Sequence, residues 1–244
     1  MQKQEYYRIE KMENKHFWYR GMRNLTLSFV SQIRGKPLKI LDAGCGAGGR
    51  AIDCLKFGYV AALDINDTAV KLTRQKNIPL VKKADICALP FPAEEFDAVL
   101  CLDVIYHREV KNDLQALKEC FRVLKPGGKL ILRVPAFEFL RGSHDIVVYT
   151  KKRYTSHEVK KLVISAGFQI LRLTYANFIL SVPLVFKRLF ERLFVKNHHP
   201  HSDSMLPPGV LNSLFYQILK AENKFLKYFD LPFGSSVICV CRKP

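Results

Sequence analysis

Apolar and polar residues alternate with two different periods along the chain from Leu38 onward. Short apolar runs typical of buried strands are separated by segments in which apolar residues recur every three or four positions, as on one face of a helix. The predicted strands span 39–42, 59–63, 80–84, 96–102, 130–134, 168–173 and 237–241. Strands that alternate with helices in this order predict a parallel α/β fold.

Local start and stop signals support the predicted helices. Asn66 or Asp67 can cap the helix after the second strand, and Thr155 with Glu158 forms a capping box for the helix before the sixth strand. The run Pro126-Gly127-Gly128 is expected to end the helix that precedes the fifth strand.

Three segments depart from this rhythm. The N-terminal part is aromatic and helical, residues 136–154 form an irregular connection, and a largely helical insertion with two apolar stripes separates the last two strands. We expect the basic amphipathic helix of the insertion, around Arg188, to pack its apolar side inward as a cap. The predicted organisation is an N-terminal cap at 1–36, a core at 37–175, a helical lid at 176–232 and the last strand of the core at 233–244.

The composition is that of a folded protein without a membrane span. Apolar residues make up 48% of the 244 positions, which argues against a disordered chain. Residues 1–8 show no secretory signal, and the longest apolar stretch, 176–186, is shorter than the roughly 20 residues that cross a bilayer. The seven cysteines include no C-x-x-C pair, so we expect reduced thiols and a cytoplasmic protein.

The formal net charge of +17 is the unusual bulk feature. It is compatible with nucleic acid, an anionic membrane surface or an acidic small substrate as partner, and equally with a basic surface that binds nothing specific. No interleaved pattern of aromatic and basic residues typical of RNA-binding modules is present.

Candidate chemistry begins with a glycine-rich turn between the first strand and the following helix. The run Asp42-Ala43-Gly44-Cys45-Gly46-Ala47-Gly48 stands where a doubly wound sheet opens its ligand crevice, and Asp64 follows the second strand, where it can bind a ribose. A dinucleotide fold would need G-x-G-x-x-G instead. Asp42 would repel a pyrophosphate but suits an ammonium and a sulfonium, so charge favours S-adenosylmethionine over NAD.

These residues resemble motif I of the class I S-adenosylmethionine-dependent methyltransferases. The resemblance continues in order through Ala84-Asp85-Ile86, Leu89-Pro90-Phe91, Phe96-Asp97-Ala98-Val99 and Leu124-Lys125-Pro126-Gly127-Gly128. It covers 38–134 and is closest to the small-molecule enzymes of the quinone and sterol branches. It implies a Rossmann-like, doubly wound sheet of seven strands with the last strand antiparallel, which agrees with the predicted strand count.

The resemblance also implies which residues contact the cofactor. Asp64 would bind the ribose, Asp85 the adenine amino group, and the residues after the fourth strand would lie where the methyl group is presented. The run 16–21 resembles an aromatic signature of a bacterial subgroup and would fold over the cofactor; alternatively, Trp18 only packs the first helix onto the sheet. The expected cofactor-binding residues are Asp42, Ala43, Gly44, Cys45, Gly46, Gly48, Asp64, Ile65, Asp85, Ile86, Leu102, Asp103, Trp18 and Arg20.

Two histidines are candidate catalytic residues. His107 follows the fourth strand and could act as a base, line the cofactor or be solvated. His144 lies beside Asp145, which could orient its imidazole as a general base. The histidines at 198, 199 and 201 suggest a metal site, but they have one nearby carboxylate and no cysteine, so a loop without metal is the favoured interpretation.

The function predicted from the sequence is methyl transfer from S-adenosylmethionine to an oxygen, nitrogen or carbon of a small acceptor. The apolar flanking segments predict an acceptor with a hydrophobic part, lipid-like or anionic, and allow peripheral contact with a membrane. An RNA methyltransferase is one alternative, although no Asn-Pro-Pro-Tyr motif for base nitrogens follows the fourth strand. A non-catalytic cofactor-binding protein on the same fold is the other.

Overall fold

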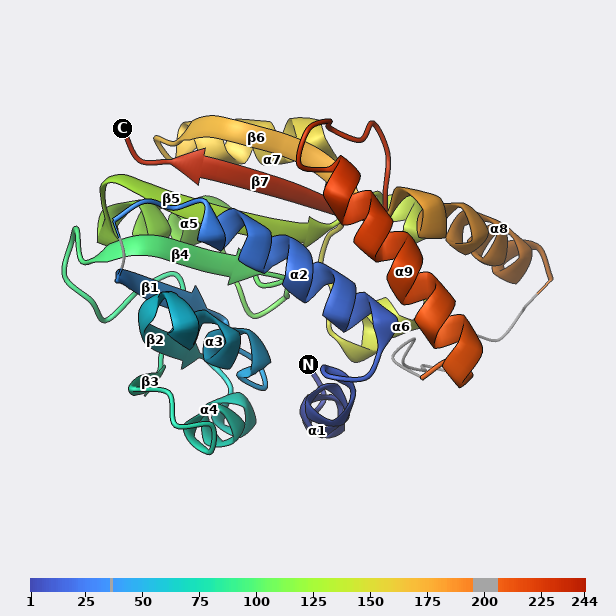
Figure 1. The fold of residues 1–244 in the computed structure, drawn as a ribbon, viewed down its shortest axis with the longest axis horizontal. Coiled ribbons are helices and arrows are strands. Elements are labelled where there is room, and N and C mark those ends of the chain that lie inside the picture. Colours follow the sequence, from blue (N-terminus) through green and yellow to red (C-terminus); the bar gives the residue numbers. More distant parts are fainter. Residues whose placement is uncertain (36, 195–205) are drawn as a thin grey trace.

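The fold is built around a single seven-stranded sheet (Figure 1). The computed structural model describes residues 1–35, 37–194 and 206–244. The strand order is β3-β2-β1-β4-β5-β7-β6, with β7 antiparallel to both β5 and β6 and the other neighbours parallel. The strands are β1 (Leu38–Ala43), β2 (Gly58–Asp64), β3 (Leu80–Lys83), β4 (Phe96–Leu102), β5 (Leu124–Pro135), β6 (Gln169–Ala176) and β7 (Ser236–Arg242). The seven predicted strands and the antiparallel last strand are therefore confirmed.

Helices cover both faces of the sheet. They are α1 (Lys3–Met12), α2 (Phe17–Ser31), α3 (Gly49–Cys54), η1 (Leu55–Phe57), α4 (Asp67–Arg74), α5 (Asp113–Val123), η2 (Glu138–Leu140), α6 (Ser143–Val147), α7 (Ser156–Ser165), α8 (Phe178–Phe194) and α9 (Gly209–Phe225). Helices α5 and α7 pack on one face, while α2 and α3 pack on the other. The central strands are buried on both sides because they are apolar at nearly every position.

The local signals act largely as expected. The Asn66 side chain accepts a hydrogen bond from the backbone N–H of Thr68, and Thr155 with Glu158 forms the capping box of α7. The helix α5 ends at Val123, but β5 starts directly at Leu124 and runs through the Pro-Gly-Gly turn, six residues earlier than predicted. Its N-terminal part pairs with Phe96 of β4 before the register shifts. The irregular connection 136–154 contains the two short helices η2 and α6.

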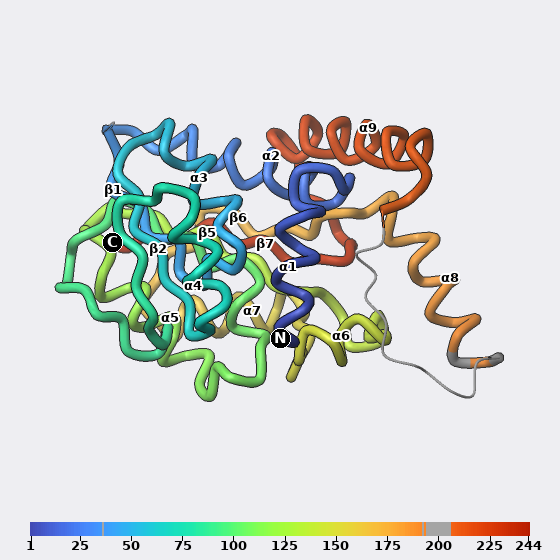
Figure 2. The backbone as a smooth tube through the Cα atoms, turned by 90° about the horizontal axis from the view of Figure 1, so that it is seen from below, coloured from blue at the N-terminus to red at the C-terminus, as the bar shows by residue number. Residues whose placement is uncertain are grey.

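The N-terminal segment and the insertion pack against each other. Helix α9 lies on α2, where a Cβ on Gly21 would come within 2.6 Å of the Leu219 side chain. The Arg20 guanidinium lies 3.7 Å from the centre of the Tyr216 ring, and the Asn223 amide donates to the carbonyl of Gly21 at 2.8 Å. Helices α8 and α9 thus stand at the end of the molecule away from α3 and α4 (Figures 1 and 2).

Helix α8 has the opposite orientation from the one predicted. Arg188 points inward and is 5% exposed, whereas the apolar stripe that includes Phe186 and Leu193 faces solvent. The guanidinium is held by the carbonyl of Leu140 and by Glu191. Periodicity reveals that a helix has two different faces, but packing partners decide which of them is buried.

Candidate active site

A cavity of about 630 Å³ lies at the carboxyl ends of β1, β2 and β4. Parallel strands with helices on both faces leave a crevice at this edge, where the strand order reverses. The walls come from the glycine-rich turn after β1, the helices α1 and α2, the connection 136–154 and one side of α8. Segments far apart in the sequence therefore enclose one space.

The glycine-rich turn forms one wall of the cavity. Gly44, Gly46 and Gly48 all have positive φ, at 90°, 55° and 83°. A Cβ on Gly44 would lie 2.3 Å from Cγ2 of Val104, so this glycine is required for close packing. A Cβ on Gly46 would meet nothing within 4 Å and would instead project into open space. Gly46 is therefore the position where the backbone can approach a ligand closely.

Asp64 is held beside this turn with lone pairs left for a ligand. Its Oδ2 accepts from the backbone N–H of Gly46 at 3.0 Å, and its Oδ1 accepts from that of Asn66 at 2.9 Å. Burial raises the pKa of Asp64, and the two backbone N–H groups oppose that rise. Each carboxylate oxygen can accept a second bond, so a ribose diol fits here. Asp85 lines the same side, fixed by a bond from the backbone N–H of Cys87 at 2.8 Å.

Asp42 lies behind the turn rather than in the cavity. It is fully buried, neither of its oxygens has a hydrogen-bond partner, and it is not among the lining residues. Burial raises its pKa to about 6, with the charge of Arg50 acting in the other direction. Arg50 does line the cavity, and its Nε has no hydrogen-bond partner. Asp42 therefore does not line the cavity as predicted, whereas Arg50, two residues after Gly48 and overlooked by the sequence prediction, does.

Asp103 is paired with a buried arginine from the neighbouring strand. It has a φ of 58° after β4 and accepts a bond from Nε of Arg133 at 3.0 Å. Arg133 is 2% exposed, and its guanidinium lies 5.0 Å from the centre of the Trp18 ring. Trp18 lines the cavity and also packs on the core. The periodicity of β5 gave no sign that Arg133 would be buried.

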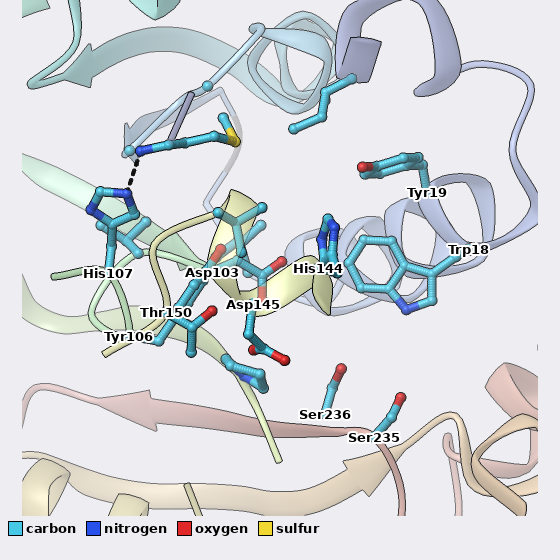
Figure 3. A pocket seen from close by; sticks show the side chains of 18 of the residues that line it. Trp18, Tyr19, Asp103, Tyr106, His107, His144, Asp145, Thr150, Ser235 and Ser236 are labelled. Carbon is cyan, nitrogen blue, oxygen red and sulfur yellow. Dashed lines mark hydrogen bonds between the residues drawn. The ribbon is translucent and has the colours of Figure 1, made fainter. Parts of the chain in front are cut away.

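His107 and His144 line different parts of the cavity (Figure 3). His107 Nδ1 accepts from the backbone N–H of Glu109 at 3.2 Å, and its Nε2 lies 2.7 Å from the Met1 amino group. Burial lowers the pKa of His107 to about 4, with the nearby amino group adding to the effect. Its imidazole is therefore neutral at pH 7. Figure 3 shows His144 on the side of Trp18 and Tyr19.

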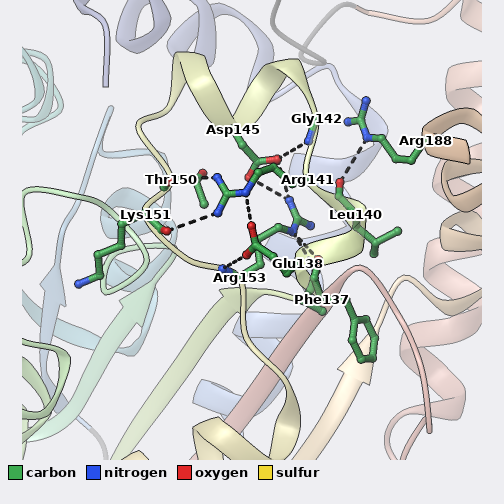
Figure 4. Close-up of polar contacts among 11 residues, drawn as sticks. Phe137, Glu138, Leu140, Arg141, Gly142, Asp145, Thr150, Lys151, Arg153 and Arg188 are labelled. Atoms are coloured by element: carbon green, nitrogen blue, oxygen red, sulfur yellow. Dashed lines mark hydrogen bonds and ion pairs between the residues drawn. The ribbon is translucent and has the colours of Figure 1, made fainter. Parts of the chain in front are cut away.

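The connection 136–154 is fixed by a network of charged side chains (Figure 4). Asp145 accepts two bonds from Nη1 of Arg153, at 3.0 and 3.1 Å, and caps α6 through the backbone N–H of Gly142. Arg141 pairs with Glu138 and donates to the carbonyl of Thr150. Asp145 is thus a partner of Arg153, which sequence reasoning missed because the two residues are brought together only by the fold of the loop.

Two buried polar oxygens in the cavity lining have no hydrogen-bond partner. Asn177 is 2% exposed with a φ of 64°, and its amide nitrogen donates to Oγ of Ser235 at 3.1 Å. Its Oδ1 has no hydrogen-bond partner, and neither has the buried Oγ1 of Thr150. Both residues line the cavity. Buried polar oxygens without donors are rare, and in a cavity they indicate where a polar group of a ligand can bind.

Most of the predicted site residues are gathered in this one cavity. Those that line it are Trp18, Gly44, Cys45, Gly46, Asp64, Ile65, Asp85, Ile86, Leu102, Asp103, His107 and His144. Ala43 and Gly48 support the turn without lining the cavity, and Arg20 lies against α9. The histidines at 198, 199 and 201 lie outside the described residues; within the described ranges, no three metal-ligating side chains are grouped.

Comparisons with known proteins agree with this geometry. A family model described as a methyltransferase domain matches residues 41–132. Cycloartenol-C-24-methyltransferase 1 of Oryza sativa subsp. japonica is 34% identical over 106 residues, which are 39% of this chain and 30% of that protein. Ubiquinone/menaquinone biosynthesis C-methyltransferase UbiE of Cronobacter sakazakii is 34% identical over 142 residues, which are 52% of this chain and 55% of that protein.

A solved structure shares the fold over nearly the whole chain. A methyltransferase of Haloferax volcanii, solved in complex with the Trm112 methyltransferase activator, superposes with a TM-score of 0.63 at 17% identity. The match covers 97% of this chain and 94% of that one. Residues 41–132 therefore carry a methyltransferase domain, and the similarity to S-adenosylmethionine-dependent methyltransferases supports S-adenosylmethionine as its cofactor. The chain spans about a third to a half of the length of the first curated relatives it matches.

Proposed function

We propose that this protein transfers the methyl group of S-adenosylmethionine to a small acceptor that has a hydrophobic part and a hydroxyl or amine group. The observation that carries the proposal is the continuity of the cavity. It extends from Gly46 and Asp64, which suit the cofactor, to the apolar side chains of Leu180, Leu184 and Phe215. Cofactor and acceptor can therefore meet in one enclosed space.

The cofactor half of the cavity matches the charges of the ligand. Asp64 offers carboxylate lone pairs to the ribose, Gly46 leaves room for the ligand beside the backbone, and Arg50 offers a cation to the carboxylate of the methionine part. The bound cofactor supplies an electrophilic methyl group on a sulfonium. Residues from α1 and α2, among them Tyr6 and Trp18, close the cavity and exclude water from it.

The acceptor half is apolar with a polar end. Leu140, Leu180, Leu184 and Phe215 line its walls. The free Oδ1 of Asn177 can only accept a hydrogen bond, so it selects an acceptor group that carries an O–H or N–H. These residues position the acceptor, and positioning supplies most of the rate enhancement when methyl, sulfur and nucleophile are held in line.

His144 is the side chain we assign as general base where the acceptor must lose a proton. It lines the cavity near Trp18 and Tyr19 (Figure 3). His107 is a poor general base at neutral pH, because its pKa is lowered to about 4. A carbon or amine acceptor that is already nucleophilic needs no base, so replacing His144 by Gln separates these acceptor classes through the pH dependence of kcat.

The first test is calorimetric titration with S-adenosylmethionine and S-adenosylhomocysteine. We expect micromolar binding that Asp64→Ala weakens at least tenfold, about 1.4 kcal/mol. Asp67→Ala is the matched control, because this carboxylate lies three residues away and its side chain is 81% exposed. Absence of binding by the folded protein would overturn the assignment of the cofactor site.

The second test measures methyl transfer from labelled cofactor to a panel of acceptors. Transfer to amphipathic alcohols or amines, reduced at least tenfold in kcat/KM by Asn177→Ala, supports the proposed acceptor class. Transfer to wholly polar acceptors or to single-stranded RNA, with none to amphipathic molecules, would show that the acceptor half has been misassigned.

A further inference from the structure

Helix α8 presents a row of apolar side chains to solvent. Ile179, Val182, Phe186, Leu189 and Leu193 follow one another at intervals of three and four residues, so they share one face of the helix. Their exposed fractions lie between 45% and 75%. Single exposed apolar residues are ordinary, but a contiguous row along a helix marks a surface that another molecule covers.

The opposite face of α8 is fixed in the protein. Leu180, Pro183, Leu184 and Lys187 line the cavity, and the buried Arg188 bonds to Glu191 at 2.7 Å. Rotating the helix to bury its apolar row would expose the cavity lining and break this contact. The outward direction of the apolar row is therefore part of the fold.

Helix α9 lies at the same end of the molecule as α8 (Figure 1). It carries exposed lysines and exposed apolar residues. Between 209 and 229 the exposed charged residues are Lys220, Lys224 and Lys227, whereas the acidic Glu222 is buried. Lys220 and Lys224 stand four residues apart on one face of α9, and Lys227 lies in the turn directly after the helix. Tyr228, just after the helix, is 79% exposed.

We propose that these two helices bind the surface of a membrane that contains anionic lipids. We define the α8–α9 surface as the five apolar residues of α8 together with Lys220, Lys224 and Lys227. The apolar row enters the boundary between headgroups and acyl chains, and the lysines meet anionic headgroups. Within the described ranges, no helix is long and apolar enough to cross a bilayer, so the contact is peripheral.

The charges favour a lipid surface over a second copy of the chain. A twofold dimer through this surface would bury the lysines of both copies in one interface, and between 209 and 229 no exposed carboxylate is present to pair with them. The net charge of +17 adds long-range attraction to an anionic surface. The inner face of α8 lines the cavity, so membrane binding would also bring the cavity next to lipid.

Flotation of the protein with vesicles tests this inference without cofactor or acceptor. We expect binding to vesicles of phosphatidylcholine and phosphatidylglycerol, and at least tenfold weaker binding to phosphatidylcholine alone. The pair Phe186→Glu/Leu193→Glu lowers binding to the anionic vesicles at least tenfold. The pair Lys220→Gln/Lys224→Gln lowers it by a similar factor, since each lysine contributes roughly fivefold at low salt.

Matched control variants lie on α7, away from the α8–α9 surface. Ile164→Glu replaces another exposed apolar residue, and Lys160→Gln/Lys161→Gln removes two other exposed lysines. Both controls should bind vesicles like the unaltered protein. Calorimetry with S-adenosylmethionine is run on every variant, because unchanged cofactor binding shows that the variant is folded and separates this inference from the proposed function.

Three outcomes would overturn the inference. One is the absence of binding to anionic vesicles by the unaltered protein at low salt. Another is a dimer in solution that Phe186→Glu/Leu193→Glu dissociates while vesicle binding is undetectable, which would assign the surface to a second copy of the chain. Equal losses in the α7 controls would show that total charge and hydrophobicity, rather than this surface, govern binding, and would likewise contradict it.

Discussion

Gly44 and Gly46 stand two residues apart in the same turn, but alanine should mainly reduce stability at Gly44 and mainly reduce cofactor binding at Gly46. Both have positive φ, so alanine at either position costs about 1–2 kcal/mol of stability. At Gly44 the new Cβ would also lie 2.3 Å from Val104 Cγ2 and 3.0 Å from Cγ1, so rotating the valine does not relieve the clash. Overpacking of this kind adds about 1–3 kcal/mol. Gly44→Ala should therefore lower the free energy of unfolding by about 2–5 kcal/mol.

At Gly46 the new methyl group meets no protein atom and points into the space assigned to the cofactor. Gly46→Ala should lower the free energy of unfolding only by the cost of the left-handed backbone conformation, about 1–2 kcal/mol. It should nevertheless weaken the binding of S-adenosylmethionine at least tenfold. Urea unfolding followed by the fluorescence of Trp18, the single tryptophan, measures stability, and calorimetry measures binding.

The double variant Gly44→Ala/Val104→Ala supplies the control. Removing the valine methyls should recover part of the lost stability, because the steric term disappears while the backbone term stays. Unchanged cofactor affinity in Gly46→Ala would refute the placement of the ligand against this turn. Equal unfolding free energies for the two single variants would refute the packing argument.

Two further predictions concern buried charges. Burial raises the pKa of Asp42 to about 6 from 3.8, so the folded state holds its proton more tightly than the unfolded state. The stability that this raised pKa contributes is fully present below pH 4 and is lost as the pH rises to 6 and above, by up to about 3 kcal/mol. The free energy of unfolding of Asp42→Asn, measured in urea at several pH values, should not show this fall. The same pH dependence in both proteins would contradict the prediction. Arg133→Met leaves Asp103 without its partner and should lower the free energy of unfolding in urea by about 3 kcal/mol. Lys83→Met breaks an exposed pair with Asp67 and should lower it by less than about 1 kcal/mol. Similar losses in the two variants would mean that burial does not strengthen the Arg133 pair.

Local patterns were enough to locate the strands and the turn that we assign to the cofactor. A buried strand needs an apolar residue at nearly every position, and a tight turn with positive φ needs glycine, so β1, β2 and β4 and the residues 44–48 could be predicted without knowledge of their neighbours. The position of Asp64 beside the turn could also be predicted, because a carboxylate directly after the second strand must lie at the same edge of the sheet as the turn.

Contacts between residues far apart in the sequence could not be predicted from the sequence. Arg133 and Asp103 are 30 positions apart, and Asn177 reaches Ser235 across 58 positions, so no periodicity connects them. The place of Asp42 behind the turn, and the exposure of Arg50 to the cavity, depend on how the turn folds over the strand end.

Helix α8 shows most clearly the difference between what the sequence determines and what only the tertiary structure decides. Its sequence determined that one face is apolar and the other charged, because side chains three and four residues apart share a face. Only the tertiary structure decided that Arg188 is turned inward, where Leu140 and Glu191 satisfy its guanidinium, and that the row from Ile179 to Leu193 faces outward. The physical reason is that amphipathicity is a property of one helix, whereas burial is a property of the surfaces that the rest of the chain brings against it.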